Sequence, residues 1–408
     1  MQPLLPRAAS RRLDALLRAM PVVVVTGPRQ VGKSSLVRDT PALADHQLID
    51  LDDTQMRIAA ERDPEDLVRR WPKVVIDEVQ RVPELLLAVK AAADEERHAT
   101  KGRFVLTGSA NLLAMHQVAD SLAGRAGYLP MAPMTRGELL GFGTTGRWHE
   151  LWRTPFNAWQ DRIASNDSIP GDWRDLARRG GFPVPALQLD EAARHEWFTG
   201  YTATYLERDL RAVSAVDSLS EFQRAMRAFA LRAGTPVNHA DVARELGLVA
   251  RTLRRWLDLL VITGQVIELG AWTVRRSTRL RRRPKFYWND PAFAMHVAGA
   301  REPDGVHLET IVLNDLRVWA ADDPDRPTLH YWRDDADREV DFVIERGDHV
   351  LAVEVKATTK PGPDDWKHLK RFVREYGDRC RGALLLHGGD ETFRATDRVL
   401  VTPWWRVL

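Results

Sequence analysis

A segment of eight residues near the amino end has the composition and spacing of a phosphate-binding loop. It reads G-P-R-Q-V-G-K-S over residues 27–34, in which two glycines bracket four residues and Lys-Ser follows. Four valines at 22–25 predict a buried strand before the loop, and residues 33–38 predict a helix behind it. The backbone N–H groups of such a loop and helix point at one position, where they bind phosphate. The candidate binding residues are Gly27, Pro28, Arg29, Gln30, Val31, Gly32, Lys33, Ser34 and Ser35.

The charged and hydroxyl side chains of this loop suit a nucleoside triphosphate. Lys33 would neutralise the outer phosphates and the Ser34 hydroxyl would hold Mg²⁺, so the expected cofactors are ATP and Mg²⁺. The alternative is a glycine turn that merely connects a strand to a helix. The strand before the loop and the helix after it argue against that alternative.

A second part of the expected nucleotide site lies further along the chain. Residues 73–78 read K-V-V-I-D-E, a short apolar strand that ends in Asp77 and Glu78. Active residues collect where parallel strands end. Asp77 is predicted to hold Mg²⁺ through water, and Glu78 to orient or deprotonate the attacking water. As an alternative, the two carboxylates could cap the segment at 79–83.

A third apolar strand, at 103–106, runs into the polar stretch T-G-S-A-N. Thr107, Ser109 and Asn111 are all candidates to contact the γ-phosphate or the water, and the sequence does not choose among them; Ser109 is included in the predicted catalytic set. Arg125 follows a glycine and is a candidate arginine finger for its own site or a neighbour's. A finger acting on a neighbour would require a homo-oligomer, and a solvated or structural arginine is the alternative.

Near the carboxyl end, two alternating segments predict a β-hairpin with an acidic site. Residues 338–345 and 349–356 flank the turn R-G-D, and a hairpin centred on its Gly-Asp places Asp341 directly opposite Glu354. Period-two alternation puts Lys356 on the same face, with the apolar residues on the other. Two opposed carboxylates repel unless a positive charge lies between them. A divalent cation with oxygen ligands resolves that conflict, and Lys356 could assist a water or leaving group.

The order D…E-x-K on a hairpin resembles the core of the PD-(D/E)XK nuclease pattern. Val340 stands where the proline of that pattern would be, and a helix predicted at 305–314 would supply Glu309 as a further metal ligand. The metal-ligand candidates of the whole chain are therefore Ser34, Asp77, Glu309, Asp341 and Glu354. The alternative is an amphipathic hairpin whose polar face is solvated.

The region 221–289 has the pattern of a winged helix-turn-helix. Asn238 is a plausible N-cap for a helix at 239–246, and Gly247 closes it as a left-handed cap would. A helix at 222–233 precedes it; a helix from about residue 250 and strands at 265–269 and 285–288 follow it.

Positive charge is concentrated in this region. Residues 251–285 hold ten Lys or Arg against two acids, a net charge of +8 where the whole chain has +2. Such clustering predicts contact with a nucleic-acid backbone, DNA being favoured, without readout of base sequence. A protein-docking module with solvated arginines is the alternative.

Composition limits the other possibilities. A chain of 408 residues predicts two to four domains, and the single Cys380 excludes an intramolecular disulfide and a cysteine-based zinc cluster. No apolar run approaches the ~18 residues of a membrane helix, and the start lacks a signal-peptide layout, so we expect a cytoplasmic protein with no membrane partner.

The expected fold is α/β. We predict a P-loop NTPase (AAA-like) domain with a parallel sheet at 1–140, a linker or insertion with a helical lid at 141–220, a winged helix-turn-helix at 221–290, and a restriction-endonuclease-like α/β domain at 291–408. The helical lid includes the segment Y-L-E-R-D-L-R at 205–211.

With these parts assembled, the chain resembles a bacterial and archaeal family that joins an AAA-type P-loop ATPase to a C-terminal domain of unknown function with restriction-endonuclease-like character. The resemblance is carried by G-P-R-Q-V-G-K-S, I-D-E-V-Q, L-T-G-S-A-N, L-A-G-R, G-F-P, Y-L-E-R-D-L-R, P-K-F-Y-W-N-D, E-V-D-F-V-I and A-V-E-V-K-A. It implies use of ATP and Mg²⁺ at Lys33, Ser34, Asp77 and Glu78, and a nuclease-like site at Glu309, Asp341, Glu354 and Lys356.

The sequence therefore predicts an ATP-hydrolysing protein that interacts with DNA by recognising its backbone or shape, branched or junction DNA included. Two other functions remain open. One is a nucleotide-dependent switch or scaffold that binds a protein partner, and the other is a toxin or defence effector in which ATP gates nucleic-acid degradation.

Overall fold

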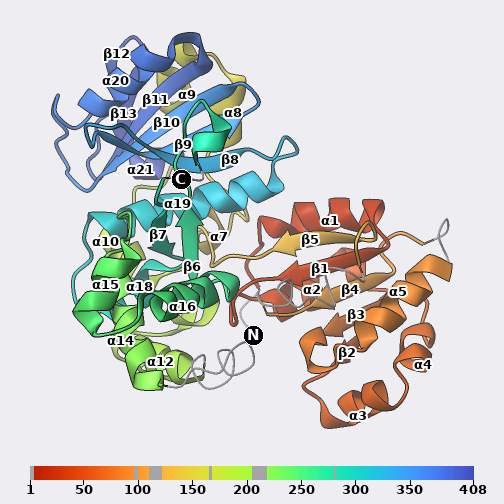
Figure 1. Cartoon of the computed structure of the whole chain (residues 1–408). Helices are drawn as coiled ribbons and strands as arrows, with labels where there is room; N and C mark the ends of the chain where they lie inside the picture. The colour runs from red at the N-terminus through yellow and green to blue at the C-terminus, as the bar shows by residue number, and fades with distance from the viewer. Residues whose placement is uncertain (1–3, 96–99, 110–121, 165–167, 205–217, 280–281) are drawn as a thin grey trace. The chain divides into compact units, whose positions relative to one another are not determined.

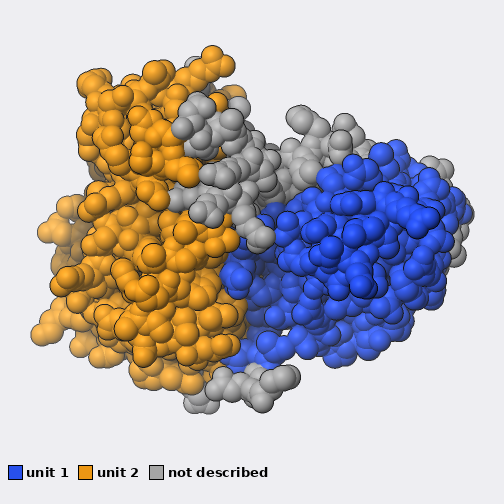
Figure 2. Space-filling model, turned by 90° about the horizontal axis from the view of Figure 1, so that it is seen from below, with its two compact units in different colours: residues 1–132, 262–264 blue, residues 133–261, 265–408 orange. Residues whose placement is uncertain are grey.

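The structure is a computed structural model of the whole chain, and it describes all residues except 1–3, 96–99, 110–121, 165–167, 205–217 and 280–281. The chain divides into two compact units, which are residues 1–132 with 262–264, and residues 133–261 with 265–408 (Figure 2). Among the described residues, no helix combines the length and the apolar character needed to cross a bilayer.

The first unit is built on a five-stranded parallel sheet with the strand order β2-β3-β4-β1-β5 (Figure 1). Its strands are β1 Val22–Thr26, β2 Gln47–Asp50, β3 Val74–Asp77, β4 Phe104–Thr107 and β5 Ala126–Pro130. Its helices are α1 Ala9–Ala19, α2 Lys33–Asp39, α3 Thr54–Arg62, α4 Pro64–Arg69 and α5 Leu85–Glu95, with 3₁₀ turns at Pro41–Leu43 and Val79–Arg81. The strand and helix predicted on either side of the phosphate-binding loop are confirmed as β1 and α2.

Register within this sheet decides which residues share an edge. Val25 of β1 pairs with Thr107 of β4, and Ile76 of β3 pairs with Leu106. Because the strands are parallel, the loop after β1 lies at the same edge as the ends of β3 and β4. The central strands are fully buried, as valine-rich strands of a parallel sheet covered on both faces are.

The second unit contains a six-stranded mixed sheet with the order β12-β13-β11-β10-β9-β8. The strands are β8 Thr328–Arg333, β9 Glu339–Arg346, β10 His349–Lys356, β11 Cys380–His387, β12 Phe393–Thr396 and β13 Val399–Pro403. The helices next to them along the chain are α19 Gly305–Asp322, α20 Lys367–Tyr376 and α21 Trp404–Val407, with a 3₁₀ turn at Gly377–Arg379.

The predicted hairpin of β9 and β10 is confirmed in its register. Ile344 pairs with Leu351 and Phe342 with Val353, and all four side chains lie in one hydrophobic core. The face expected to be polar is also buried, because Val343 and its neighbours belong to a second core that includes residues of α20. Both faces of the sheet are therefore covered, and the solvated polar face of the alternative is absent from this hairpin.

A bulge interrupts β9 at Asp341. His330 of β8 pairs with Val343 and Trp332 pairs with Val340, so two residues of β9, Asp341 and the one after it, lie where β8 contributes one. Val340 and Val343 consequently enter the same core, which strict alternation would not allow. The bulge changes the direction of the Asp341 side chain from the one that simple period-two alternation predicts.

Between the two sheets in sequence lie helices and a small antiparallel pair of strands. The helices are α14 Leu219–Ala230, α15 His239–Leu246, α16 Ala250–Ile262, α17 Arg276–Arg279 and α18 Pro291–Ala298, and the strands are β6 Val266–Leu269 and β7 Lys285–Trp288. Asn238 caps α15 by accepting from Ala240 N–H, and Gly247 ends it with φ 70°, as predicted. The segment after β6 joins the large sheet, since Trp272 N–H donates to Tyr331 O at 2.6 Å.

The tryptophan-rich stretch predicted to be a linker or insertion is instead part of the second unit's core. This stretch, from residue 141, forms α8 Trp148–Arg153, α9 Trp159–Ala164 and α10 Trp173–Arg179, with a 3₁₀ turn at Phe156–Ala158. Helix α7 Arg136–Leu139 precedes it, and α11 Pro183–Gln188 and α12 Glu191–Thr204 follow. Trp148, Trp159 and Trp173 are buried in the same core as Leu384 of β11. These helices are too short to show a sustained period in the sequence, which is why the pattern resembled a linker. Residues 205–211 of the predicted lid lie outside the described residues.

Candidate functional site

The loop after β1 has the backbone shape that its glycines permit. Gly27 has φ 145° and Gly32 has φ 94°, and Gln30 between them also has a positive φ of 65°. A Cβ on Gly27 would lie 2.3 Å from the carbonyl oxygen of Met131, so only glycine fits there. The close approach of the loop to the end of β5 fixes the position of its first residue.

Lys33 is held inside this loop. Its Nζ donates to the carbonyl oxygens of Gly27 at 3.1 Å and Pro28 at 2.9 Å, and the residue is only 5% exposed. The first residue of α2 thus keeps its ammonium at the loop, where an anion at the helix N-terminus would meet it. That Lys33 binds phosphate stays a prediction.

Arg7 braces the loop, and the sequence pattern did not single it out. Its guanidinium donates to Val31 O at 2.6 Å and to Ala132 O at 2.8 Å. A residue far from the motif in sequence therefore ties the loop to the segment after β5. Only the tertiary contact identifies it.

Asp77, Glu78 and Thr107 meet at the edge of the sheet next to the loop. The Thr107 hydroxyl donates to the Asp77 carboxylate and accepts from Glu78 N–H at 3.2 Å. Of the three polar candidates, Thr107, the last residue of β4, thus contacts Asp77. Ser109 is buried two residues further on, and Asn111 lies outside the described residues.

Glu78 adopts a left-handed backbone conformation, φ 58° and ψ 43°, which is strained for a residue other than glycine. Its carboxylate accepts from the Gln80 amide and does not cap the following 3₁₀ turn, so the capping alternative does not describe it. Strain of this kind persists where the surrounding structure imposes it, and it is common at active sites.

A positive charge from α2 faces Asp77 and the neighbouring Asp50. Arg38 Nη2 lies 2.9 Å from Asp50 Oδ2 and 3.7 Å from Asp77 Oδ2. Arg38 was not predicted as a site residue. Its separation of five residues from Lys33 places it on a different face of α2, so the sequence pattern gave no signal for it.

Arg125 lies at the amino ends of the parallel strands, whereas the phosphate-binding loop lies at their carboxyl ends. It directly precedes β5, whose first residue pairs with Val22 at the start of β1, whereas the loop follows the end of β1. The five residues of β1 separate the two ends of the sheet, about 16 Å. Its guanidinium is bound to the carboxylate of Asp94, with Nη2–Oδ2 at 2.9 Å. The prediction that Arg125 serves its own nucleotide site is therefore wrong, and a role in a neighbouring molecule stays a prediction.

In the second unit, four carboxylates come together at the β9–β10 hairpin. We call them the acidic cluster, and its members are Glu309, Glu339, Asp341 and Glu354. Asp341 Oδ2 accepts a hydrogen bond from Val355 N–H at 2.9 Å. The last pair of the β9–β10 ladder is Phe342 with Val353, and Asp341 and Glu354 are the next residues beyond it. Lys356 Nζ donates to Glu354 Oε1 at 2.6 Å.

Two residues of β7 enter this cluster, and neither was predicted. The Tyr287 hydroxyl donates to Glu309 Oε2 at 2.8 Å. Lys285, only 1% exposed, places Nζ against Glu339 and 3.7 Å from Asp341 Oδ1. The acidic cluster is thus completed by a strand that the sequence assigned to the winged helix-turn-helix.

Burial and mutual repulsion set the protonation of these groups. Burial, together with the negative charge of Asp341, raises the pKa of Glu309 to about 8. Burial opposes the charge of Lys285, but the nearby carboxylates of Asp341, Glu309 and Glu339 outweigh it and raise the lysine pKa. The lysine therefore stays charged while part of the cluster takes up protons.

The residues present do not fit the predicted divalent-cation site. Among the residues that the structure describes, no group of three or more His, Cys, Asp or Glu side chains is arranged to hold a metal ion. The positive charge that the opposed carboxylates require is supplied by ammonium groups.

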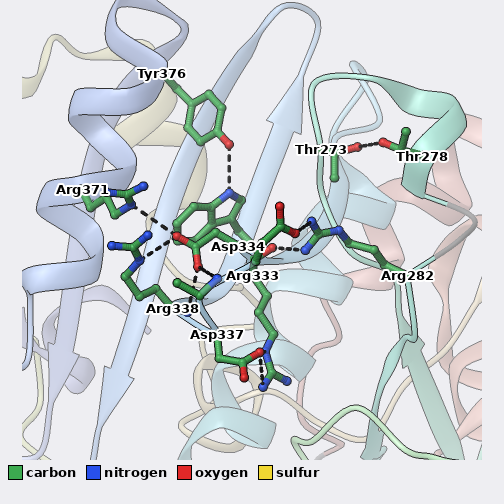
Figure 3. Close-up of polar contacts among 12 residues, drawn as sticks. Thr273, Thr278, Arg282, Arg333, Asp334, Asp337, Arg338, Arg371 and Tyr376 are labelled. Atoms are coloured by element: carbon green, nitrogen blue, oxygen red, sulfur yellow. Dashed lines mark hydrogen bonds and ion pairs between the residues drawn. The ribbon is translucent and has the colours of Figure 1, made fainter.

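Ion pairs within the second unit neutralise part of the positive charge counted at 251–285. Arg279 forms a bidentate pair with Glu345, at 2.6 and 2.8 Å. Arg282, which Figure 3 shows beside Arg333, pairs with Asp335 at 2.8 Å. Together with Lys285, three of the ten basic residues face acidic partners of the C-terminal sheet. A count along the sequence could not include those partners, so it overestimated the free charge of the wing. Arg281 lies outside the described residues.

Three family models match successive parts of the chain. Residues 19–140 match the model described as an AAA domain. The first unit contains an AAA-type ATPase domain. Residues 170–304 and 304–407 match two domains of unknown function, DUF8612 and DUF4143. The P-loop residues and Asp77, Glu78 and Thr107 all lie within the ATPase domain.

The matching relatives extend over nearly the whole chain. The uncharacterized protein Rv2008c of Mycobacterium tuberculosis is 28% identical over 415 residues, covering 98% of this chain and 84% of the relative, and Mb2031c of Mycobacterium bovis gives the same values. Among solved structures, the Walker-type ATPase PABY2304 of Pyrococcus abyssi has 17% identity and a TM-score of 0.44, covering 72% of this chain and 99% of that one. The Orc1 protein of Aeropyrum pernix, solved in complex with DNA, has 13% identity and a TM-score of 0.28, covering 72% and 91%.

The contact at Gly27 predicts a stability effect within the ATPase domain. In Gly27→Ala the new Cβ meets the backbone oxygen of Met131, which is itself fixed because its N–H donates to Thr26 O at 2.7 Å. We expect the free energy of unfolding of the domain to fall by ~2–4 kcal/mol. Gly124→Ala is the control, since its φ of 76° is strained but no atom of the described residues lies within 4 Å of the added Cβ. Denaturant titration of both variants measures the difference, and equal losses would contradict the close contact.

Proposed function

We propose that this protein hydrolyses ATP with Mg²⁺ and binds the backbone of a nucleic acid, DNA being favoured, through α16. Mg²⁺, when bound, would neutralise charge on the β- and γ-phosphates, and its protein ligands would be Ser34 and, through water, Asp77. Lys33 would neutralise the outer phosphates, and Glu78 would orient the attacking water. Thr107 would fix the Asp77 carboxylate by its hydrogen bond.

The observation that supports nucleic-acid binding is the exposed basic face of α16. Arg251 and Arg254 are exposed and form no ion pair with any residue that the structure describes. Helix α15 is joined to α16 through Gly247, Leu248 and Val249, the short glycine-containing turn of helix-turn-helix units, whose second helix enters the major groove. The proposed site is therefore α16, because ion pairs with acidic residues near the C-terminal sheet neutralise part of the positive charge of the segment between β6 and β7.

The electrostatic environment next to α16 is consistent with this surface. Burial lowers the pKa of His239, at the start of α15, and the charges of Arg254 and Arg283 lower it further, against an opposing effect of Asp258. The contribution of the two arginines, although smaller than that of burial, reflects positive charge near this end of α15, which attracts phosphates. We assign no metal-dependent cleavage to the acidic cluster, since its residues do not fit the cation.

The test is a paired arginine substitution with a charge-matched control. Arg251→Ala/Arg254→Ala should weaken binding to a DNA duplex at least tenfold and reduce the slope of log K against log salt by about two, because each removed phosphate contact lowers it by about one. Arg153→Ala/Arg374→Ala removes two exposed arginines elsewhere in the same unit and should leave binding unchanged. Fluorescence anisotropy with duplex, junction and single-stranded probes measures both quantities. Equal affinities of the two double variants would contradict the proposed surface.

A further inference from the structure

Several oxygen atoms of the acidic cluster already accept hydrogen bonds from the protein. Asp341 Oδ2 accepts from Val355 N–H, Glu354 Oε1 from Lys356, and Glu309 Oε2 from the Tyr287 hydroxyl. Among the described residues, Glu354 Oε2 is a buried carboxylate oxygen without a hydrogen-bond partner. A hard divalent cation takes about six oxygen ligands, and these donors already compete for one oxygen of each of the three carboxylates.

The ammonium of Lys285 lies on the side of the other Asp341 oxygen, Oδ1. Its Nζ lies 3.7 Å from Asp341 Oδ1 and closer to Glu339 Oε1. The lysine is fully buried and stands 5.5 Å over the Tyr331 ring, so it has no route to solvent while β7 stays in place. A buried ammonium is tolerated only where carboxylates pair with it.

We propose that Lys285 is the built-in counter-cation of the acidic cluster, and that its ammonium keeps divalent cations out while β7 stays docked on the C-terminal sheet. With Lys285 present, the four carboxylates face two ammonium groups, those of Lys285 and Lys356. Removing the Lys285 charge leaves one ammonium for four carboxylates and frees Asp341 Oδ1. The same side chains then offer both the charge and the oxygen that a cation needs.

Titration of the full-length, nucleotide-free protein with Mn²⁺, followed by electron paramagnetic resonance, tests this. Wild type should bind no more Mn²⁺ than Asp341→Asn does. Lys285→Met keeps the length of the side chain without its charge and should bind Mn²⁺ at least about tenfold more tightly than wild type. Arg283→Met, two residues earlier and exposed, removes the same charge from the same segment and should behave as wild type.

Thermal unfolding supplies a second readout. Lys285→Met leaves buried carboxylates unpaired, so its midpoint should fall by about 10 °C, and Mn²⁺ should raise it again only in this variant. A folded Lys285→Met that gains no Mn²⁺ affinity overturns the proposal. If that variant does not fold, wild type decides: Mn²⁺ binding that Asp341→Asn abolishes overturns the proposal, and equal binding by the two supports it.

Discussion

Lys33→Ala should reduce the rate of ATP hydrolysis by about 1,000-fold or more and weaken nucleotide binding. The ammonium of Lys33 is held at the loop by two carbonyl oxygens, so its charge is already in place before a phosphate arrives. Preorganised charge of this kind stabilises the transition state at no cost in reorganisation, and removing it typically costs several kcal/mol of barrier, ~4 here. Steady-state phosphate release and binding of a fluorescent ATP analogue measure the two effects.

Lys101→Ala is the matched control for that experiment. Lys101 is an exposed lysine of the same unit, and it precedes β4 at the edge of the sheet away from the loop. Its removal changes the net charge equally and should leave hydrolysis unchanged. Undiminished hydrolysis in Lys33→Ala would show that the triphosphate binds elsewhere.

Glu78→Gln should separate binding from hydrolysis. The amide keeps the size of the side chain and its contact with Gln80, but it is no longer a base, so we expect hydrolysis to fall by about 100-fold or more while ATP still binds. The backbone N–H of Glu78, which donates to Thr107, is unaffected by the substitution. Single-turnover hydrolysis and equilibrium binding of ATP, measured on the same preparation, distinguish the two steps.

Glu84→Gln serves as the control, because Glu84 is exposed and lies after the 3₁₀ turn that follows Glu78. Equal rates for Glu78→Gln and wild type would assign the catalytic base to another residue. Loss of ATP binding together with hydrolysis would instead indicate that Glu78 shapes the pocket rather than activating water.

Features of the chain that depend on local pattern could be predicted from the sequence. The loop at 27–34, the strand that ends at Asp77 and the register of the β9–β10 hairpin each follow from residues close together in the chain. The cap at Asn238 and the stop at Gly247 follow from the geometry of helix ends. In each case the physical cause lies within a few residues of the feature.

Features that depend on distant partners could not be predicted. Arg7 reaches the loop only through the tertiary fold, and Lys285 meets Asp341 only because β7 lies against β9. Arg125 was assigned from its neighbours in sequence, whereas the parallel register of β1 and β5 decides which edge it occupies. The net charge at 251–285 was counted correctly, but ion pairs such as Arg279–Glu345 neutralise part of it.

The segment after β6 packs on the large sheet and shields its outermost strand from other molecules. Trp272 is buried against Trp332 and Phe372, and its backbone pairs with the outermost strand at Tyr331. Detaching that segment would uncover an indole-sized hollow and a row of unpaired amides, which is the surface that recruits foreign strands into aggregates. The carboxyl-terminal sheet thus depends on a residue from an earlier part of the chain to cover this part of its core.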